Sequence, residues 1–352
     1  MKLNKLLLAI GLTVALYSCD SASKDDITPA PKGTGTYILN NGNWGSNDSN
    51  IGIYDPTTKT LTADAFKAAN GQNLGDLGQD IISIGENIYI AVNGSQTIFV
   101  TDADLKIKQQ INADKDGARL SPRYFTTSGD KVYVTYYEGF VGEISSDYSV
   151  KLCPVGPNPE GAAVAGGDLY VANSGGMAYP TYNNTVSVVS MSTFTETSTI
   201  EVSVNPAKVE ASSDGAYVYV SSFGNYAEVP AKLQVITVAS GLVADLDYPS
   251  VSAIAKGKND ILYILCGGYD ENWNPLPGTV YKHDMKANKT LGTFVTDGTT
   301  LPNAYSISAT SDGYVYVGCS DYVNTGDVYV FSPEGRLHDK FDSQGMNPVK
   351  AY

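Results

Sequence analysis

The chain has 352 residues, 37 acidic against 23 basic side chains, and a formal net charge of −14. Phosphate backbones bind to positive surfaces, so this acidic balance argues against nucleic acid as a partner. The sequence has no CxxC pair and no Cys/His cluster, so no zinc site is predicted. For Cys153, Cys266 and Cys319, packed free thiols are favoured over a disulfide.

The first 18 residues have the pattern of an export signal. Lys2 and Lys5 precede an apolar run from Leu6 to Leu16, which is too short to span a bilayer. The run ends in L-Y-S-C, which resembles a bacterial lipobox whose cysteine becomes the lipidated first residue. The alternative is an ordinary secretory signal followed by an incidental cysteine. We predict a lipoprotein signal peptide over residues 1–18 and lipidation at Cys19.

Residues 19–35 are polar and contain Pro and Gly, which is typical of a flexible tether. Acidic residues just after Cys19 resemble the signal that sends Bacteroidetes lipoproteins to the outer surface. Removal of residues 1–18 leaves 334 residues and deletes two lysines, so the charge moves from −14 to −16. The sequence thus predicts an acidic domain attached to a membrane by lipid rather than spanning it.

One phrase recurs six times between residues 78 and 317. An apolar or small-residue strand, often led by Pro, is followed by a tight Gly, Asp or Asn turn and then by a Tyr-Val or Tyr-Ile strand. The chain ends on the first half of this phrase, N347-P-V-K-A-Y352, and its missing second half is T36-YILNN41. Seven complete pairs therefore require the last strand to pair with the first one, which closes a ring.

The repeat length also indicates the architecture. The repeat tyrosines are spaced 37 to 53 residues apart, as expected for blades of four short strands; they are Tyr37, Tyr89, Tyr133, Tyr170, Tyr219, Tyr263 and Tyr316. Third strands are expected at 50–55, 97–102, 139–145, 185–190, 233–238, 279–284 and 327–332. We predict an all-β fold, a seven-bladed β-propeller over residues 36–352.

Loop lengths distinguish the two faces of such a ring. Turns between first and second strands are short, whereas the loops between second and third strands are long in most blades and open on the opposite face. These loops contain both tryptophans and eight other rings, which we predict to bind ligand: Trp44, Tyr137, Phe140, Tyr179, Tyr182, Phe223, Tyr226, Tyr269, Trp273 and Tyr322. The alternative is that these rings cap the blade ends and shield the core.

Two arginines lie in a connection between blades that reaches the same face. Arg119 and Arg123 are candidates for hydrogen bonds to ligand amides or a phosphate, and the alternative is a local ion pair with Asp114 or Asp116. The only histidines, His283 and His338, are expected away from this face. We therefore predict no catalytic residue, no metal site and no enzyme activity.

Two segments carry a resemblance to a known group: the opening G-x-YILN-x-GNWGSN and the stretch AANGQNLGDLGQDI. With the lipoprotein start, they resemble the DUF5074/YncE-like (YVTN-type) surface propellers of Bacteroidetes, over essentially the whole mature chain. That group includes BtuG-like lipoproteins, which bind cobalamin across one propeller face. The resemblance implies a lipid-anchored outer-membrane protein facing the cell exterior, with cobalamin or a related corrinoid as ligand, not cofactor. It also implies a BtuB-like TonB-dependent transporter as partner.

Two other functions remain open from the sequence. A surface glycan-binding or protein-docking propeller would use exposed tryptophans. A carboxylate-based hydrolase or lyase would need two acids at a defined separation. Its candidate carboxylates near the aromatic face are Asp76, Asp80, Glu138, Glu160, Asp270, Glu271 and Asp321.

Overall fold

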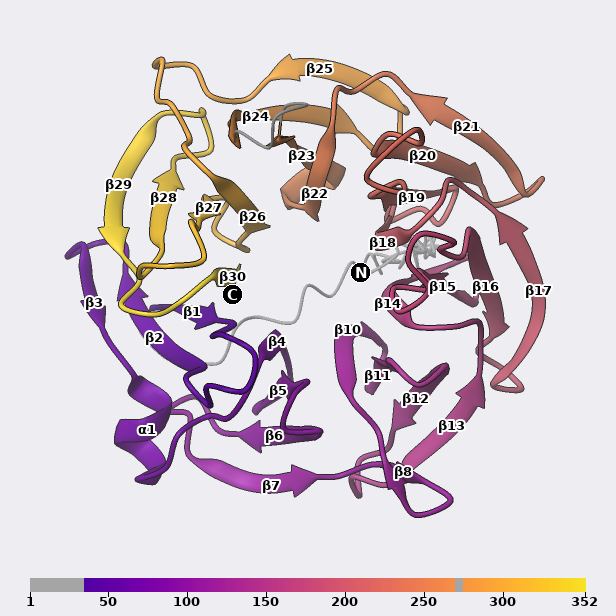
Figure 1. The fold of residues 1–352 in the computed structure, drawn as a ribbon, viewed down its shortest axis with the longest axis horizontal. Coiled ribbons are helices and arrows are strands. Elements are labelled where there is room, and N and C mark those ends of the chain that lie inside the picture. The colour runs from indigo at the N-terminus through magenta and orange to yellow at the C-terminus, as the bar shows by residue number, and fades with distance from the viewer. Residues whose placement is uncertain (1–34, 270–274) are drawn as a thin grey trace, which may run out of the picture.

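The computed structural model describes residues 35–269 and 275–352. The predicted signal peptide, Cys19, the tether up to residue 34 and Trp273 lie outside the described residues. Seven four-stranded antiparallel sheets follow one another around a ring, which confirms the predicted seven-bladed β-propeller (Figure 1). Within the described ranges, no helix is long and apolar enough to cross a bilayer.

Each blade runs from an innermost strand at the ring axis to an outermost strand at the rim. Blade 1 consists of β30 (Pro348–Ala351), β1 (Thr36–Asn40), β2 (Asn50–Asp55) and β3 (Thr60–Thr62). Blade 2 consists of β4 (Gly78–Ile84), β5 (Asn87–Val92), β6 (Thr97–Thr101) and β7 (Ile107–Ile111). Blade 3 consists of β10 (Pro122–Ser128), β11 (Lys131–Tyr136), β12 (Phe140–Ile144) and β13 (Val150–Pro154).

Blades 4 to 7 repeat this order. Blade 4 consists of β14 (Pro159–Ala165), β15 (Asp168–Asn173), β16 (Thr185–Ser190) and β17 (Thr195–Glu201). Blade 5 consists of β18 (Pro206–Ala211), β19 (Tyr217–Ser222), β20 (Lys232–Thr237) and β21 (Leu242–Leu246). Blade 6 consists of β22 (Val251–Lys256), β23 (Ile261–Tyr269), β24 (Pro275–Asp284) and β25 (Lys289–Thr293). Blade 7 consists of β26 (Ala304–Ala309), β27 (Val315–Cys319), β28 (Asp327–Phe331) and β29 (Leu337–Asp342).

The connections carry a few short elements. Helix α1 (Ala65–Asn70) links blades 1 and 2, and a small hairpin of β8 (Asp114–Lys115) and β9 (Ala118–Arg119) links blades 2 and 3. A 3-10 turn, Lys258–Asp260, joins β22 to β23. The β23–β24 hairpin is more regular than the sequence indicated, because Tyr269 still pairs with Pro275 where an irregular loop was predicted.

Ring closure occurs where it was predicted. Strand β30 pairs antiparallel with β1, with Ile38 opposite Ala351, and the backbone amides of Tyr37 and Tyr352 each donate to the other residue's carbonyl at 2.8 and 2.9 Å. The last strand is thus the innermost strand of blade 1, beside β4 and β26 (Figure 1). This pairing supplies backbone partners that an open sheet edge would lack.

The core consists of hydrophobic layers between neighbouring blades. All seven repeat tyrosines are buried, with exposed fractions of 8% or less, so the repeated residue is a core residue. Several of their hydroxyl groups find partners at this depth: Tyr37 donates to the carbonyl of Ala103 and Tyr219 to that of Met285. The three thiols of Cys153, Cys266 and Cys319 are buried and free, as predicted.

The closing strand generates a stability prediction. Ala351 is buried among Ile38, Tyr54 and Tyr316, so the change Ala351→Asp places a charge in an apolar cluster. We expect the free energy of unfolding to fall by about 3 kcal/mol or more in urea titrations followed by circular dichroism. The matched control is Leu291→Asp on the outermost strand β25, where the side chain is 46% exposed. Equal losses in the two variants would contradict the role assigned to the closing strand.

Candidate ligand-binding site

The two faces of the ring differ as the sequence indicated. Inner strands begin, and second strands end, on the face that carries the long loops; we call it the loop face. Most of the large apolar side chains that are strongly exposed belong to this face: Trp44, Met177, Tyr179, Tyr226, Leu276, Tyr322 and Val323. The opposite face carries the short turns between first and second strands.

A β-bulge recurs in all seven blades near the loop-face end of the innermost strand. In each blade the pairing between the innermost strand and its neighbour shifts after the first pair, for example between Pro122 and Phe125 in blade 3. The residues left without a strand partner are Gln79, Arg123, Tyr124, Glu160, Gly161, Ala207, Ser252, Tyr305 and Val349. Because a bulge redirects side chains, it turns these positions toward the loop-face end of the axis.

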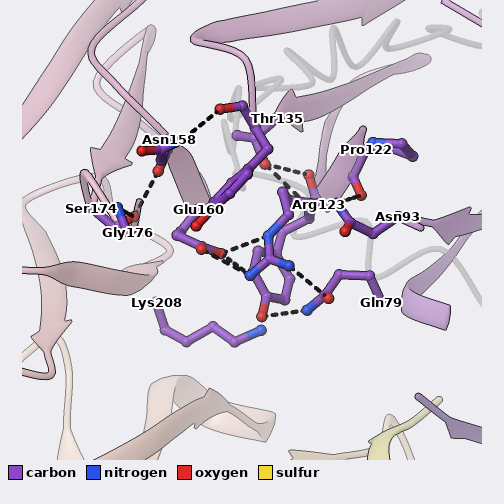
Figure 2. A network of polar contacts seen from close by, with 12 residues as sticks. Gln79, Asn93, Pro122, Arg123, Thr135, Asn158, Glu160, Ser174, Gly176 and Lys208 are labelled. Carbon is purple, nitrogen blue, oxygen red and sulfur yellow. Dashed lines mark hydrogen bonds and ion pairs between the residues drawn. The ribbon is translucent and has the colours of Figure 1, made fainter. Parts of the chain in front are cut away.

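Bulge residues of three adjacent blades are joined by hydrogen bonds. Arg123 of blade 3 donates from Nε and Nη2 to the carboxylate of Glu160 in blade 4, at 2.7 to 2.9 Å, and from Nη1 to Oε1 of Gln79 in blade 2 at 2.9 Å (Figure 2). The Nε2 group of Gln79 in turn donates to the hydroxyl of Tyr124 at 2.7 Å. Lys208 of blade 5 and the ion pair Lys350–Asp80 complete what we call the axial cluster.

The Arg123–Glu160 pair is well shielded from solvent, with side chains only 19% and 10% exposed. Burial lowers the pKa of Arg123, but the Glu160 carboxylate, Tyr124 and Tyr137 together raise it above its ordinary value, so the guanidinium stays charged. The guanidinium carbon also lies 5.1 Å from the ring centroid of Tyr137 and 5.5 Å from that of Tyr124. A bidentate, stacked arginine of this kind is rigid and fixes the rings beside it.

The two predicted arginines therefore have different environments. Arg123 belongs to the axial cluster, and its ion-pair partner is Glu160 instead of Asp114 or Asp116. Arg119 is exposed on the β8–β9 hairpin, at the outer edge of the ring in Figure 1. Its strand partner is Asp114, but no carboxylate of the described residues lies within ion-pair distance of its side chain. The alternative ion pair is thus wrong for both arginines, and the hairpin is too peripheral to join Arg119 to the axial cluster.

Five of the predicted aromatic residues lie next to one another across blades 4 to 7. Tyr182 packs edge-to-face against both Tyr179 and Tyr226, with centroids 6.0 and 6.1 Å apart. Beyond Tyr226 lies a cavity of about 510 Å³, whose ring-bearing lining residues are Phe223, Tyr226, Tyr305 and Tyr322. Tyr305 and Tyr322 stack edge-to-face on its far side, with centroids 5.7 Å apart. We call these six residues the tyrosine arc: Tyr179, Tyr182, Phe223, Tyr226, Tyr305 and Tyr322.

The tyrosine arc and the axial cluster are close enough to interact electrostatically. Burial raises the pKa of the Tyr305 phenol, while the Arg123 guanidinium lowers it. Burial also raises the pKa of Tyr226, and Tyr182 and Glu160 raise it further. Tyr305, a bulge residue that also lines the cavity, joins the tyrosine arc to the loop-face end of the axis.

The remaining predicted rings are placed differently. Trp44 is 80% exposed in the blade 1 loop, and Tyr137 is half-buried against Arg123. Phe140 begins β12 and packs against the core between blades 2 and 3, as the capping alternative implied. Tyr269 ends β23, and Trp273 lies outside the described residues.

The sequence missed Tyr124, Tyr305 and Lys208, and it treated Glu160 only as a candidate acid. The sequence did contain a pattern that marks these four residues. Each lies one or two residues after the start of an innermost strand, and this position recurs in every blade. Reading that position around the ring would have selected these residues.

The other groups considered for catalysis have structural partners. His283 is buried, burial lowers its pKa, and its ring contacts the Tyr248 hydroxyl at 2.9 Å. His338 lies on the outermost strand β29, so both histidines are away from the loop face, as predicted. Among the candidate acids, Asp76, Glu138 and Asp321 accept hydrogen bonds from loop backbone amides. No group of three potential metal ligands occurs in the described part of the chain.

Comparison with known proteins identifies the fold and nothing finer. No protein-family model matches the chain, and no curated protein is similar to it in sequence. Among solved structures, a putative 6-phosphogluconolactonase from Bacteroides fragilis NCTC 9343 has a TM-score of 0.62 at 14% identity, covering 92% of this chain and 99% of that one. Hydrazine synthase from Kuenenia stuttgartiensis has a TM-score of 0.56 at 18% identity over 71% and 74%. A computationally designed protein, Ika8, has a TM-score of 0.57 at 14% identity over 90% and 91%. At such low identity these likenesses concern the propeller fold alone.

The buried ion pair generates a second stability prediction. The change Glu160→Gln removes the charge that Arg123 faces while keeping the shape of the side chain. We expect the free energy of unfolding at pH 7 to fall by about 2–4 kcal/mol, because the guanidinium is left uncompensated. The matched control is Asp116→Asn, which removes the exposed Lys115–Asp116 pair and should change stability little. Similar urea midpoints for the two variants would show that the Arg123–Glu160 pair does not stabilise the contact between blades 3 and 4.

Proposed function

We propose that this protein is a non-catalytic, cell-surface binding protein that captures cobalamin or a related corrinoid on its loop face. The observation that carries the proposal is the cavity of about 510 Å³ bordered by the tyrosine arc. Its size is in the range of small-molecule sites, and it combines rings with a few polar groups. The propeller fold fits a role in ligand binding or docking.

The shape and chemistry of a corrinoid suit such a surface. The molecule is broad and partly apolar, with amide groups around its edge, so it could contact several rings at once. Each ring contributes on the order of 1 kcal/mol beyond burial, and many contacts are needed for tight binding. The polar lining includes Ser250, Ser252, Asn303 and Ser320, which can exchange hydrogen bonds with amides. Packed loops on a closed ring lose little conformational freedom when ligand binds.

Location and partner follow from the N-terminal pattern and the resemblance described above. A lipid on Cys19 would hold the propeller at the outer membrane, facing the cell exterior. The tether would let the loop face approach a BtuB-like TonB-dependent transporter and pass the corrinoid to it. These proposals rest on residues 1–34, on the opening motif of the mature chain and on AANGQNLGDLGQDI.

A glycan-binding or protein-docking propeller is the second candidate. It is favoured by the exposed rim of the loop face, where Trp44, Met177 and Val323 are 80%, 78% and 77% exposed. The flat Trp44 ring can stack on a sugar, and the exposed Met177 and Val323 side chains can contact another protein. A carboxylate-based hydrolase is disfavoured because Glu160 is held by Arg123 and Asp80 accepts from the backbone amide of Phe125.

Isothermal titration calorimetry with cyanocobalamin and cobinamide tests the proposal on protein lacking residues 1–19. We expect one-to-one binding with a Kd of about 1–100 nM. The changes Tyr226→Ala and Tyr322→Ala should each weaken binding about tenfold or more, because each removes a ring bordering the cavity. Trp44→Ala tests the exposed rim in the same way, and Trp273→Ala tests the contribution predicted for that ring from the sequence.

The control is Leu242→Ala, an equally exposed apolar residue on the outer strand β21, which should leave affinity unchanged. No heat at tens of micromolar protein would overturn the corrinoid proposal and direct attention to glycans.

A further inference from the structure

Lys208 is a cation near the ring axis that has no ion-pair partner among the described residues. It lies on β18, and its ammonium nitrogen is 3.3 Å from the ring centroid of Tyr124 in blade 3. Figure 2 shows the side chain extending below the Arg123–Glu160 pair. Within the described residues, no carboxylate lies at ion-pair distance from this ammonium and no hydrogen-bond acceptor contacts it. Its hydrogen-bonding capacity is therefore unused.

The hydroxyl of Tyr124 also has an unused proton, and the reason lies in the amide of Gln79. Arg123 donates to Oε1 of Gln79, which leaves Nε2 facing Tyr124. That nitrogen donates to the Tyr124 oxygen at 2.7 Å, so the phenol accepts there and must direct its own proton elsewhere. The described part of the chain offers this proton no acceptor.

Tyr305 presents a third donor from the opposite side of the ring. It is the bulge residue of blade 7 and lines the cavity of the tyrosine arc. Its phenol is close enough to interact electrostatically with both Arg123 and Tyr124. Among the described residues, its hydroxyl has no hydrogen-bond partner. Lys208 and Tyr124 therefore place two donors together, and Tyr305 directs a third from the equivalent bulge of blade 7, where the described residues supply no acceptor.

We propose that the Lys208 ammonium and the hydroxyl groups of Tyr124 and Tyr305 form a binding subsite for an oxyanion, a carboxylate or a phosphate group. A negatively charged group placed there would satisfy all three donors through charge-assisted hydrogen bonds. Arg123, held by Glu160 and Gln79, positions Tyr124 and adds positive potential. The subsite goes beyond the corrinoid proposal and does not depend on it.

Charge around the subsite supports this inference. At this end of the axis Arg123, Lys208 and Lys350 face Asp80 and Glu160, and both carboxylates are engaged by other cations. The pKa of Lys208 is lowered to about 8, chiefly by burial; Lys350 also lowers it, whereas Asp80, Glu160 and Glu210 raise it. Burial also raises the pKa of Glu210, while Lys350, Lys256 and Lys208 lower it. A bound anion would stabilise the protonated form of Lys208.

The test follows the ¹³Cε chemical shift of Lys208 in lysine-labelled protein, assigned by its absence in Lys208→Met. Sulfate, whose charge is constant between pH 6 and 10, probes a phosphate-like group, and acetate probes a carboxylate, both against chloride at equal ionic strength. We expect saturable binding of one probe with a Kd of about 1–10 mM at pH 7. Tighter sulfate binding would assign a phosphate, and tighter acetate binding a carboxylate.

The pH dependence has a definite sign. Only the protonated amine attracts an anion, so affinity should be constant below the pKa of about 8 and fall about tenfold per pH unit above it. The bound anion should raise the pKa of Lys208. Tyr124 and Tyr305 titrate above this range, because burial raises the pKa of each phenol.

Variants separate the subsite from general charge effects. Binding to Lys208→Met, which lacks the labelled lysine, is measured by tyrosine difference absorbance. This variant should lose at least about tenfold in affinity. Tyr124→Phe and Tyr305→Phe should each lose about threefold to tenfold. The control is Lys151→Met. Lys151 lies on the outermost strand β13, with its ammonium 5.3 Å from the ring centroid of Phe194, and the variant should bind anions like the unchanged protein.

Absence of saturable binding by either probe, or unchanged binding in Lys208→Met, would overturn the subsite. Sulfate or acetate binding without corrinoid binding would retain the subsite and overturn the corrinoid proposal instead.

Discussion

The pairing of β30 with β1 is the constraint on which the rest of the structure depends. It makes the last strand of the chain the innermost strand of the first blade, so that seven inner strands surround one axis. With the ring closed, neighbouring blades hold each other's loop-face ends in place. The Arg123–Glu160 pair and the Gln79 amide span blades 2 to 4 and can form only when those blades keep their spacing.

The loop face has two chemically distinct parts. Its rim carries exposed rings and aliphatic side chains, while the axis carries a compact set of charges in an otherwise acidic protein. Rings supply contact area with little loss of rotamer freedom, and buried charges supply orientation. A ligand that combines a broad apolar body, amide edges and one anionic group would use both parts at once.

The sequence predicted the fold well because the repeat was carried by residues that the core requires. Every repeat tyrosine is buried, and the incomplete repeats that begin at residues 36 and 347 predicted which two strands pair to close the ring. The site was harder to predict. Arg123 meets Glu160 across 37 positions and two blades, whereas a local reading offered Asp114 and Asp116. Phe140 looked like a face residue, yet the register of β12 turns it toward the core. Tyr124 and Tyr305 reach the site because of bulges in their strands. A bulge depends on how two strands pair, and the identity of a single residue does not reveal that pairing.

Hydrogen–deuterium exchange with and without saturating cyanocobalamin tests the central claim, that ligand binds on the loop face at the ring axis, most directly. The account predicts slowed exchange in the loops at 174–184 and 223–231 and at the starts of β10 and β26. The turns of the opposite face, at 85–86, 129–130 and 166–167, should exchange as before. Slowed exchange confined to those turns, or no change anywhere, would contradict the account.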